Sequence, residues 1–399
     1  MLTYPDLLAA CSPGGASVLT AVTELGAAAG DHASVAPAKF IRGNTPTFAF
    51  EHRFIDGQSQ RAVMIDSKQS ILNRAEAALR ADMLDGHPVI SRIPRIEVGY
   101  GEERYSDLDL PHRAFDGHIR AGSIDGEPAA KSLAYRAIRD SSPRDSSAAL
   151  STAPAYLVFG GWDSTRKSHQ VRQRSALTGE IIGILANQDI SDKEQIDLRG
   201  GARVDPVGMS IQLTKGEMEE LIQSQIDELS ATTLKKIESE TRGAKGSQRF
   251  SASTLVLGGI APRLEALGGV SCRRIIRSWT LSFSTLRQLR FNAGPEGDAA
   301  GRALLAALAL AGMSRADRDL YLRANCDLIE KDAPQIQLHH RHGRRENIDS
   351  LDVEAADTLL EEAMQHASDK TGVEWSGQIL DVVGNPSIHQ SATANTGNQ

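Results

Sequence analysis

The sequence predicts an α+β fold, because segments of strand character and segments of helix character alternate along the chain. Residues 47–66 are expected to form a β-hairpin, with Asp56-Gly57 as the turn between two strand-like runs. An amphipathic helix is expected to follow at once, from Ser67 to about Arg80. Short apolar runs at 181–185 and 279–283 predict further strands.

The helix at 67–80 has a clear apolar face. Ser67 is the expected N-cap, since a hydroxyl there can accept a hydrogen bond from a free backbone N–H of the first turn. The residues expected to face the core are Ile71, Leu72, Ala75, Ala78 and Leu79, and those expected on the opposite face are Gln69, Asn73, Glu76 and Arg80.

The other elements follow from similar patterns. Residues 112–121 and 128–139 are expected to be helical, with a turn at 123–126 between them. Tyr156–Phe159 has the length and composition of a buried strand. The remaining expected elements are a strand at Phe250–Leu257 and helices near 299–312, 315–330 and 353–367.

We expect one domain over residues 1–385, with an insertion at about 186–250 and a disordered tail at 386–399. The insertion contains a helix opened by Thr214-Lys215-Gly216-Glu217, which has the spacing of a capping box. It ends in a Gly-rich basic loop, Thr241–Arg249. The tail is polar and lacks aromatic residues, which is typical of disorder.

Composition excludes several classes of protein. The net charge of −7 argues against a protein that coats nucleic acid with its whole surface. The acid is concentrated at the end: from Glu346 onward ten acidic residues face one Lys, a net −9, which leaves +2 for residues 1–345. Three distant cysteines and no long apolar run predict a soluble, cytoplasmic protein without disulfides, zinc ribbon or membrane span.

Residues 157–175 have a phosphate-binding composition. A Gly pair ends the apolar run and opens into basic and hydroxyl residues, which neutralise phosphates and fix their register. The main candidates for RNA-backbone contact are Arg166, Lys167, Arg172 and Arg174, with Ser164, His169 and Ser175 as further candidates. Trp162 is either a face on which a base stacks or part of the core. The alternative for the whole segment is a solvated basic loop.

Lys68 lies in the first turn of its helix, where the positive end of the helix dipole disfavours a cation unless an anion is bound. Gln69, Asn73 and Arg74 could add donors to the same phosphate site. The alternative is a Lys that keeps its amine in water. His112 and Arg113 either line the same groove or cap a helix.

Five segments, taken in order, give the chain a resemblance to a known family. They are Asp66-Ser67-Lys68-Gln69-Ser70-Ile71-Leu72-Asn73-Arg74, Pro111-His112-Arg113-Ala114-Phe115-Asp116, Phe159-Gly160-Gly161-Trp162-Asp163-Ser164, Gly258-Gly259-Ile260-Ala261-Pro262 and the run from Leu281 to Phe291. Together they resemble the backbone subunit of type I-G (formerly I-U) CRISPR interference complexes, a branch of the repeat-associated RAMP proteins. The chain departs from that pattern at Gly259 and Ala261, where Asn and Pro are more typical.

The resemblance implies a ferredoxin-like core, similar to an RNA-recognition motif, with long insertions that form a thumb and fingers. It also implies a structural subunit that polymerises along CRISPR RNA with the other subunits of the complex and meets target DNA through guide pairing. Arg242, Lys245 and Arg249 would then belong to a thumb or contact RNA. No membrane partner and no cofactor are expected.

Catalysis has little support in the residues. Asp66 resembles the position of a target-cleaving acid in type III relatives, but it is more simply a capping residue. His339-His340-Arg341-His342 lacks a matching carboxylate or Cys, so we expect a polar surface turn and no metal. We therefore expect no enzyme. The alternatives are a RAMP-type RNA endonuclease with His112 or His169 as general base, and a phosphate-binding small-molecule enzyme.

Overall fold

The structure is a computed structural model that describes residues 2–201, 211–243, 246–258, 263–349 and 351–388. The chain divides into two compact units, which we describe separately. Of the described residues, the first unit combines 2–195 with 269–349 and 351–388, and the second contains 196–201, 211–243, 246–258 and 263–268. Among the described residues, no helix is both long and apolar enough to cross a lipid bilayer.

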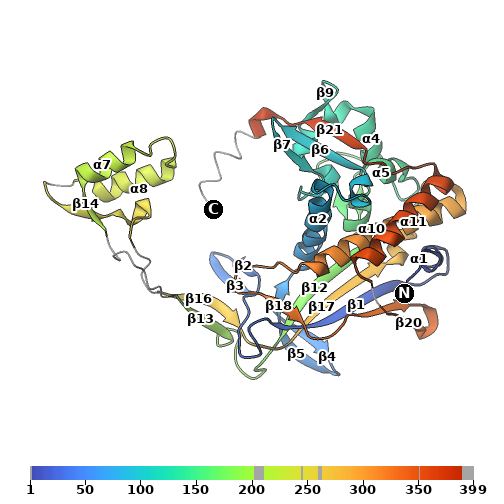
Figure 1. The fold of residues 1–399 in the computed structure, drawn as a ribbon, viewed down its shortest axis with the longest axis horizontal. Coiled ribbons are helices and arrows are strands. Elements are labelled where there is room, and N and C mark those ends of the chain that lie inside the picture. The colour runs from blue at the N-terminus through green and yellow to red at the C-terminus, as the bar shows by residue number, and fades with distance from the viewer. Residues whose placement is uncertain (1, 202–210, 244–245, 259–262, 350, 389–399) are drawn as a thin grey trace. The chain divides into compact units, whose positions relative to one another are not determined.

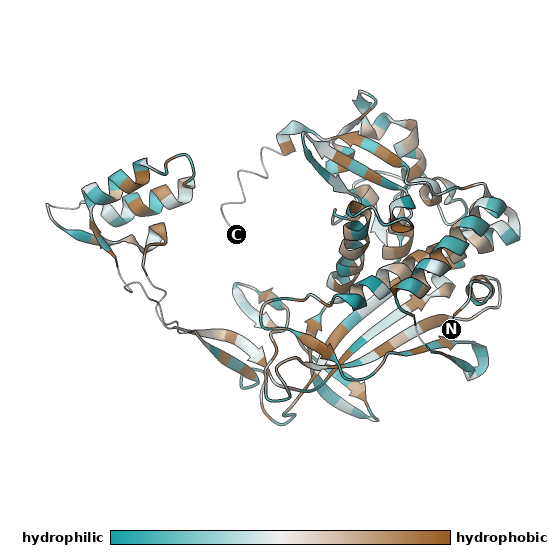
Figure 2. Cartoon of the chain, viewed as in Figure 1, coloured by the Kyte–Doolittle hydropathy of each residue, from teal (hydrophilic) through white to brown (hydrophobic). Residues whose placement is uncertain are grey.

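A large antiparallel sheet forms the base of the first unit (Figure 1). In spatial order its strands are β20 (Arg345–Ile348), β19 (Gln335–His339), β1 (Val18–Ala27), β17 (Cys272–Ser282), β12 (Leu177–Leu185), β5 (Gln58–Asp66) and β4 (Phe50–Ile55), and β18 (Leu328–Glu330) also pairs with β1. Hydrophobic residues run along these strands (Figure 2). In β17 they alternate with polar ones, so that Ile275, Trp279 and Leu281 are buried on one face.

The middle of this sheet is a ferredoxin-like core. The chain passes through β1, α2 (Lys68–Leu84), β12, β17, α10 (Gly294–Arg318) and β19, which is the order β-α-β-β-α-β. The four strands lie as β19-β1-β17-β12, so the first and third strands of the motif are central. The expected α+β, ferredoxin-like fold is therefore confirmed.

The helices lie on one side of the sheet (Figure 1). α10 is buried along almost its whole length because it packs against α2, α11 (Val353–Thr371), α1 (Tyr4–Cys11) and β17. Its sequence, rich in Ala, Gly and Leu, suits that position, since small side chains allow close approach of neighbouring helices.

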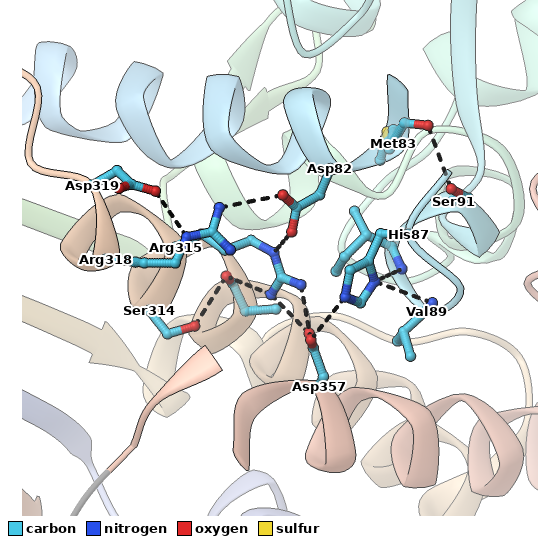
Figure 3. A network of polar contacts seen from close by, with 12 residues as sticks. Asp82, Met83, His87, Val89, Ser91, Ser314, Arg315, Arg318, Asp319 and Asp357 are labelled. Carbon is cyan, nitrogen blue, oxygen red and sulfur yellow. Dashed lines mark hydrogen bonds and ion pairs between the residues drawn. The ribbon is translucent and has the colours of Figure 1, made fainter. Parts of the chain in front are cut away.

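A network of buried charges joins α2, α10 and α11 (Figure 3). Arg315 is fully buried and binds Asp82 of α2 at 2.7 Å and Asp357 of α11 at 2.7 and 2.9 Å. Burial raises the pKa of Asp82, but its hydrogen bonds to Arg315 and Arg318 outweigh that effect, so its pKa lies below the ordinary value. The Nε2 of His87 lies 3.4 Å from Asp357.

A second, smaller sheet and several short helices form a lobe of the first unit. The strand order is β7 (Glu103–Ser106), β6 (Arg95–Tyr100), β21 (Ile379–Val383), β8 (Ser123–Ile124) and β9 (Glu127–Pro128), with β21 parallel to β6. The helices are α3 (Gly117–Arg120), α4 (Leu133–Arg139), α5 (Ser147–Thr152) and α6 (Ala155–Phe159). Two further hairpins are β2–β3 (Lys39–Arg42, Thr45–Phe48) and β10–β11 (Gly161–Trp162, Arg172–Gln173).

The second unit contains two short ribbons and two helices. β13 (Ile196–Gly201) pairs with β16 (Arg263–Val270), and β14 (Gln212–Thr214) pairs with β15 (Arg249–Ser251). α7 (Lys215–Gln223) begins at the expected capping box of Thr214 and Glu217, and α8 (Ala231–Thr241) follows. Met218, Ile237 and Ala252 form a small core of their own.

Several expected elements are wrong or displaced. Tyr156–Phe159 is the buried helix α6 and no strand, since the backbone turns helically after Pro154 and stops at Gly160. Residues 250–257 contain only the end of β15 and a 3-10 turn, Ala252–Leu255. No helix covers 319–327, because α10 ends at Arg318 and β18 begins at Leu328.

The helix after the hairpin, α2, is longer than expected. It is buried on the predicted apolar face and also on part of the face that was expected to be exposed. Ser67 caps it as predicted by accepting from the N–H of Ser70 at 3.3 Å. Glu76 and Arg80, expected on the exposed face, are only 2% and 7% exposed. They face the lobe and pair there with Arg113 and Glu97, which sequence periodicity alone does not reveal.

Candidate nucleic-acid interface

A cleft of about 730 Å³ lies in the first unit between the start of α2, residues 111–113 and the β10–β11 hairpin. Segments more than one hundred residues apart in the sequence meet here. Its lining residues are Lys68, Gln69, Leu72, Asn73, Pro111, His112, Arg113, Phe159, Gly160, Gly161, Trp162, Arg172, Gln173, Arg174, Ser175 and Thr178. We call it the basic cleft, because this lining includes four Lys or Arg residues and no acid.

The basic cleft gathers most of the residues that the sequence proposed for RNA contact. Nine of the fourteen main candidates line it: Lys68, Gln69, Asn73, His112, Arg113, Trp162, Arg172, Arg174 and Ser175. Sequence reasoning missed Gln173, whose position between the two arginines in the same basic segment was the available signal.

The start of α2 forms one side of the basic cleft. Lys68 and Gln69 are the first two helical residues and both side chains are exposed. Among the described residues, no ion pair or hydrogen bond to the Lys68 amine is present. The N-terminus of α2 carries the positive end of the helix dipole, and the Lys68 amine adds a positive charge beside it. This side of the basic cleft therefore attracts an anion.

The β10–β11 hairpin forms another side of the basic cleft. Trp162 pairs with Arg172 across the two strands, and the Arg172 guanidinium lies 5.2 Å from the centre of the indole ring. Trp162 is 51% exposed, so the alternative of a core tryptophan is wrong. An exposed indole beside a cation offers a surface on which a base can stack.

The Gly pair is required by close packing at the floor of the basic cleft. Gly160 has a positive φ of 93°, and a Cβ there would lie 2.6 Å from the Ser175 hydroxyl oxygen. A Cβ at Gly161 would lie 2.9 Å from the Phe115 ring. The Ser175 hydroxyl donates to the Phe159 carbonyl at 2.7 Å. Ser175 therefore fixes the hairpin to α6 as well as lining the cleft.

Arg113 lines the basic cleft, but its charge is used inside the protein. Its Nε and Nη2 donate to both oxygens of Glu76, and its Nη1 donates to the Gly160 carbonyl at 3.1 Å. Burial raises the pKa of Glu76 above its ordinary value, although Arg113 acts against the shift. Arg113 thus positions the Gly pair, and the cations left for a ligand are Lys68, Arg172 and Arg174.

Five of the main candidates lie outside this lining, so the basic cleft does not bring them together with the other nine. Arg74 donates to Asp66 at 3.0 Å, and Arg166 pairs with Asp140 and the Arg139 carbonyl. Ser164 and Lys167 are exposed on the loop between β10 and β11, outside this lining. His169 lines a neighbouring cleft instead.

The other basic candidates are spread over the chain. Arg242 and Arg249 belong to the second unit and are exposed, and Arg249 donates to the Gln212 carbonyl at 2.8 Å. Lys245 lies outside the described residues, as do residues 259–262 of the fourth family-like segment. The arginines at 273–290 are largely engaged within the protein; Arg274, for example, binds Glu24 at 2.7 Å.

The two candidates for metal chemistry have other roles. Asp66 is fully buried, and its oxygens accept from Arg74 and Arg323, each at 3.0 Å. Ser67, and not Asp66, caps the helix. Residues 341–343 form a 3-10 turn at the surface, and the described part of the chain contains no group of three His, Cys, Asp or Glu placed to hold a metal ion.

Part of the chain is similar to a known protein family. No curated protein matches the chain. Residues 19–188 match the family model described as CRISPR-associated protein GSU0053 (Cas_GSU0053). The matched segment runs from β1 to just beyond β12 and includes every residue that lines the basic cleft. The match over residues 19–188 indicates a CRISPR-associated protein and supports a role in CRISPR defence.

Proposed function

We propose that the protein binds CRISPR RNA in the basic cleft and serves as the backbone subunit of a type I-G effector complex, with several copies along one guide. The observation that carries this proposal is the meeting of an exposed tryptophan with Lys68, Arg172 and Arg174 in one cleft without acidic lining, where none of these three cations has an ion pair with another described residue. That cleft lies within the segment similar to a CRISPR-associated family.

The chemistry of the basic cleft suits the backbone of a single strand better than a particular base sequence. Lys68, Arg172 and Arg174 neutralise phosphates wherever the strand carries them. Trp162 stacks on any base, since every base has a flat face. Sequence specificity then comes from pairing of the guide with target DNA, and the protein contributes shape and charge.

The second unit is the candidate for the thumb of this subunit. It has its own small core around Met218 and Ile237, and Arg242 and Arg249 are exposed on it. Neighbouring copies and the other subunits of the complex are its proposed contacts. No catalytic role and no cofactor are part of this proposal.

Co-expression of the protein with a repeat-spacer array tests the proposal directly. Large particles that contain protein and nuclease-protected RNA are expected, because binding in the cleft and packing of copies along one strand reinforce each other. Size-exclusion chromatography and extraction of the bound RNA measure this. Recovery of RNA-free monomers that retain no RNA even at low salt would contradict the proposal and favour a small-molecule enzyme.

The second candidate function is an RNA endonuclease, which the exposed position of His112 in the basic cleft keeps open. A His general base needs no metal, so cleavage of repeat RNA in the presence of a chelator would favour it. His169 is a less suitable candidate for this role, because it lies in the neighbouring cleft.

We expect the parent protein not to cleave target RNA in the presence of Mg²⁺ or Mn²⁺, and we expect Asp66→Asn to behave in the same way. A buried carboxylate whose oxygens are held by two arginines is not available to a metal ion. Gel analysis of labelled target RNA measures this, and thermal unfolding shows whether the variant is folded. RNA cleaved by the parent and spared by a folded variant would place the chain among the nucleases.

A further inference from the structure

A cleft of about 520 Å³ lies in the first unit between the end of α10, the segment from β18 to β19 and the start of α11. It shares no lining residue with the basic cleft. Its apolar lining residues are Ala333, Pro334, Ile336, Leu351 and Val353. Ile336 and Leu351 are only 5% and 9% exposed, whereas Pro334 and Val353 are half-buried and Ala333 is exposed. We call this cleft the apolar groove.

Acidic side chains border the apolar groove. Its charged lining residues are Asp317, Arg318, Glu330, Asp349, Asp352 and Glu354, which is five acids against one base. The fully buried Arg277 binds Asp317 and Glu330. Asp352 and Glu354 are exposed, and among the described residues neither forms an ion pair. The groove therefore suits a partner that carries cations beside apolar side chains, since interfaces combine an apolar centre with complementary charge at the rim.

The β2–β3 hairpin has this complementary character. Lys39, Phe40, Ile41 and Arg42, which form β2, are all exposed, and Ile41 is 77% exposed. Residues 39–48 contain two cations and no acid. Neither cation has an ion pair or a side-chain hydrogen bond with another described residue. Because a two-stranded hairpin is only marginally stable by itself, a surface that covers it would stabilise it.

The tip of the hairpin presents its apolar and basic side chains close together. Ile41 lies directly opposite Pro46 in the neighbouring strand, so the two side chains share one face. Lys39 lies on the same face as Ile41, two residues earlier, and Arg42 is the last residue before the turn. The turn itself is tight, with a φ of 64° at Gly43. An apolar centre flanked by two cations therefore projects at this end.

The hairpin does not occupy the apolar groove of its own chain. The Ala38 N–H donates to the Ile65 carbonyl at 3.2 Å, which fixes the base of the hairpin at the end of β5. Four strand spacings of about 4.8 Å separate β5 from β19, which is roughly 19 Å. Figure 1 shows the hairpin at the margin of the first unit, well apart from α11. No residue of 39–48 lines the groove.

We propose that the β2–β3 hairpin of one copy docks in the apolar groove of the next copy along the RNA. Ile41 contacts Pro334 and Val353, and Lys39 and Arg42 face the acidic border. Two different surfaces meet in this contact, so it repeats head to tail and produces an open row of copies. The inference rests on the proposed function, which places several copies on one guide, and it identifies the surfaces through which they meet.

Cysteine cross-linking tests this contact. The double variant Ile41→Cys with Ala333→Cys is assembled on a long single-stranded RNA and oxidised with copper phenanthroline. We expect a ladder of dimers, trimers and larger species on a non-reducing gel, because every copy then carries both halves of the contact. The ladder should disappear on reduction. A mixture of the two single variants should stop at dimers, since each copy can then form only one link.

Phe54→Cys with Ala333→Cys is the matched control, because Phe54 on the edge strand β4 is 79% exposed and does not line the groove. Neither this control nor the oxidised parent should give a ladder. A ladder of equal strength in the control would overturn the docking. RNA-bound particles without a ladder in the Ile41→Cys, Ala333→Cys variant would also overturn it and leave the proposed function intact. Absence of RNA-bound particles of the parent would remove the proposed function and this inference with it.

Reversal of charge separates a contact between copies from a contact with RNA. Arg42→Glu should weaken assembly on long RNA about tenfold, because it places an acid against the acidic border. Binding to a short RNA that holds one copy should stay unchanged. Adding Glu354→Lys should restore most of the assembly, since the attraction returns with its signs exchanged. Loss of binding to the short RNA, without restoration by Glu354→Lys, would show that the hairpin binds RNA and would overturn the docking.

Discussion

Replacing Arg172 and Arg174 together with glutamate is expected to weaken binding of single-stranded RNA about 100- to 1000-fold at low salt, whatever its sequence. Each replacement removes a phosphate contact and adds a charge that repels the strand. Both side chains are exposed and line the basic cleft, so the change should not disturb the core. Fluorescence anisotropy with two unrelated RNA sequences measures the effect.

The salt dependence gives an independent readout of the same contacts. Loss of two phosphate contacts should reduce the slope of log affinity against log salt concentration by about 1.4, or 0.7 per phosphate on a single strand. Lys68→Glu should act in the same direction with about half the change in slope. Because these contacts carry no base information, both RNA sequences should lose affinity by the same factor.

Lys167→Glu is the matched control, since Lys167 is an exposed cation of the same basic segment that does not line the cleft. It reverses the same charge a few residues away and should change affinity only slightly at physiological salt. If Lys167→Glu lost as much RNA affinity as the double variant, the effect would come from overall charge and not from contacts in the basic cleft. Loss of affinity for one sequence alone would contradict backbone binding.

The sequence predicted the residue types of the basic cleft well because these are local. The Gly pair ends an apolar segment, and basic residues follow it. Such a pattern indicates a sharp turn of the backbone next to a cluster of positive charge, whether the apolar segment is a strand or a helix. The helix start at Ser67 was equally clear, since capping depends on residues only three apart. Lys68 and Arg172 could therefore be predicted as contact residues before it was known that they line the same cleft.

What the sequence did not reveal depends on contacts between distant segments. Glu76 falls on the polar face of α2 by periodicity, yet it is buried against Arg113, 37 residues later. Five apolar residues, Ala155 to Phe159, fit a buried strand and a buried helix equally, and only the packing of the lobe decides. Whether an Arg forms an ion pair has the same cause: Arg166 and Arg172 belong to the same basic segment, but among the described residues only Arg166 forms one, with Asp140.

Arg113→Met is expected to lower the free energy of unfolding by about 3–5 kcal/mol. The change leaves the carboxylate of Glu76, only 2% exposed, without its partner, and an unpaired buried charge costs about that much. It also removes the hydrogen bond to the Gly160 carbonyl and the contact with the Phe159 ring. Urea unfolding measures the loss, and Arg136→Met, at an exposed position of α4, is the control that should change little.

The pH dependence distinguishes this cause from a general packing defect. In the variant the pKa of Glu76 should rise further above its ordinary value, because burial remains and Arg113 no longer opposes it. A carboxyl whose pKa is raised by folding destabilises the protein above its unfolded pKa, and the penalty disappears as the pH falls below that value. The deficit of Arg113→Met should therefore shrink from pH 7 towards pH 4.

The double variant Arg113→Met with Glu76→Gln separates stability from RNA binding. Removing both charges leaves no unpaired ion, so most of the lost stability should return. In the double variant the Gly160 carbonyl still lacks the hydrogen bond from Arg113, so the Gly pair that precedes Trp162 is held less firmly. RNA affinity should therefore remain below that of the parent. A double variant as unstable as Arg113→Met would contradict the charge argument, and one that binds RNA normally would show that Arg113 does not position the cleft.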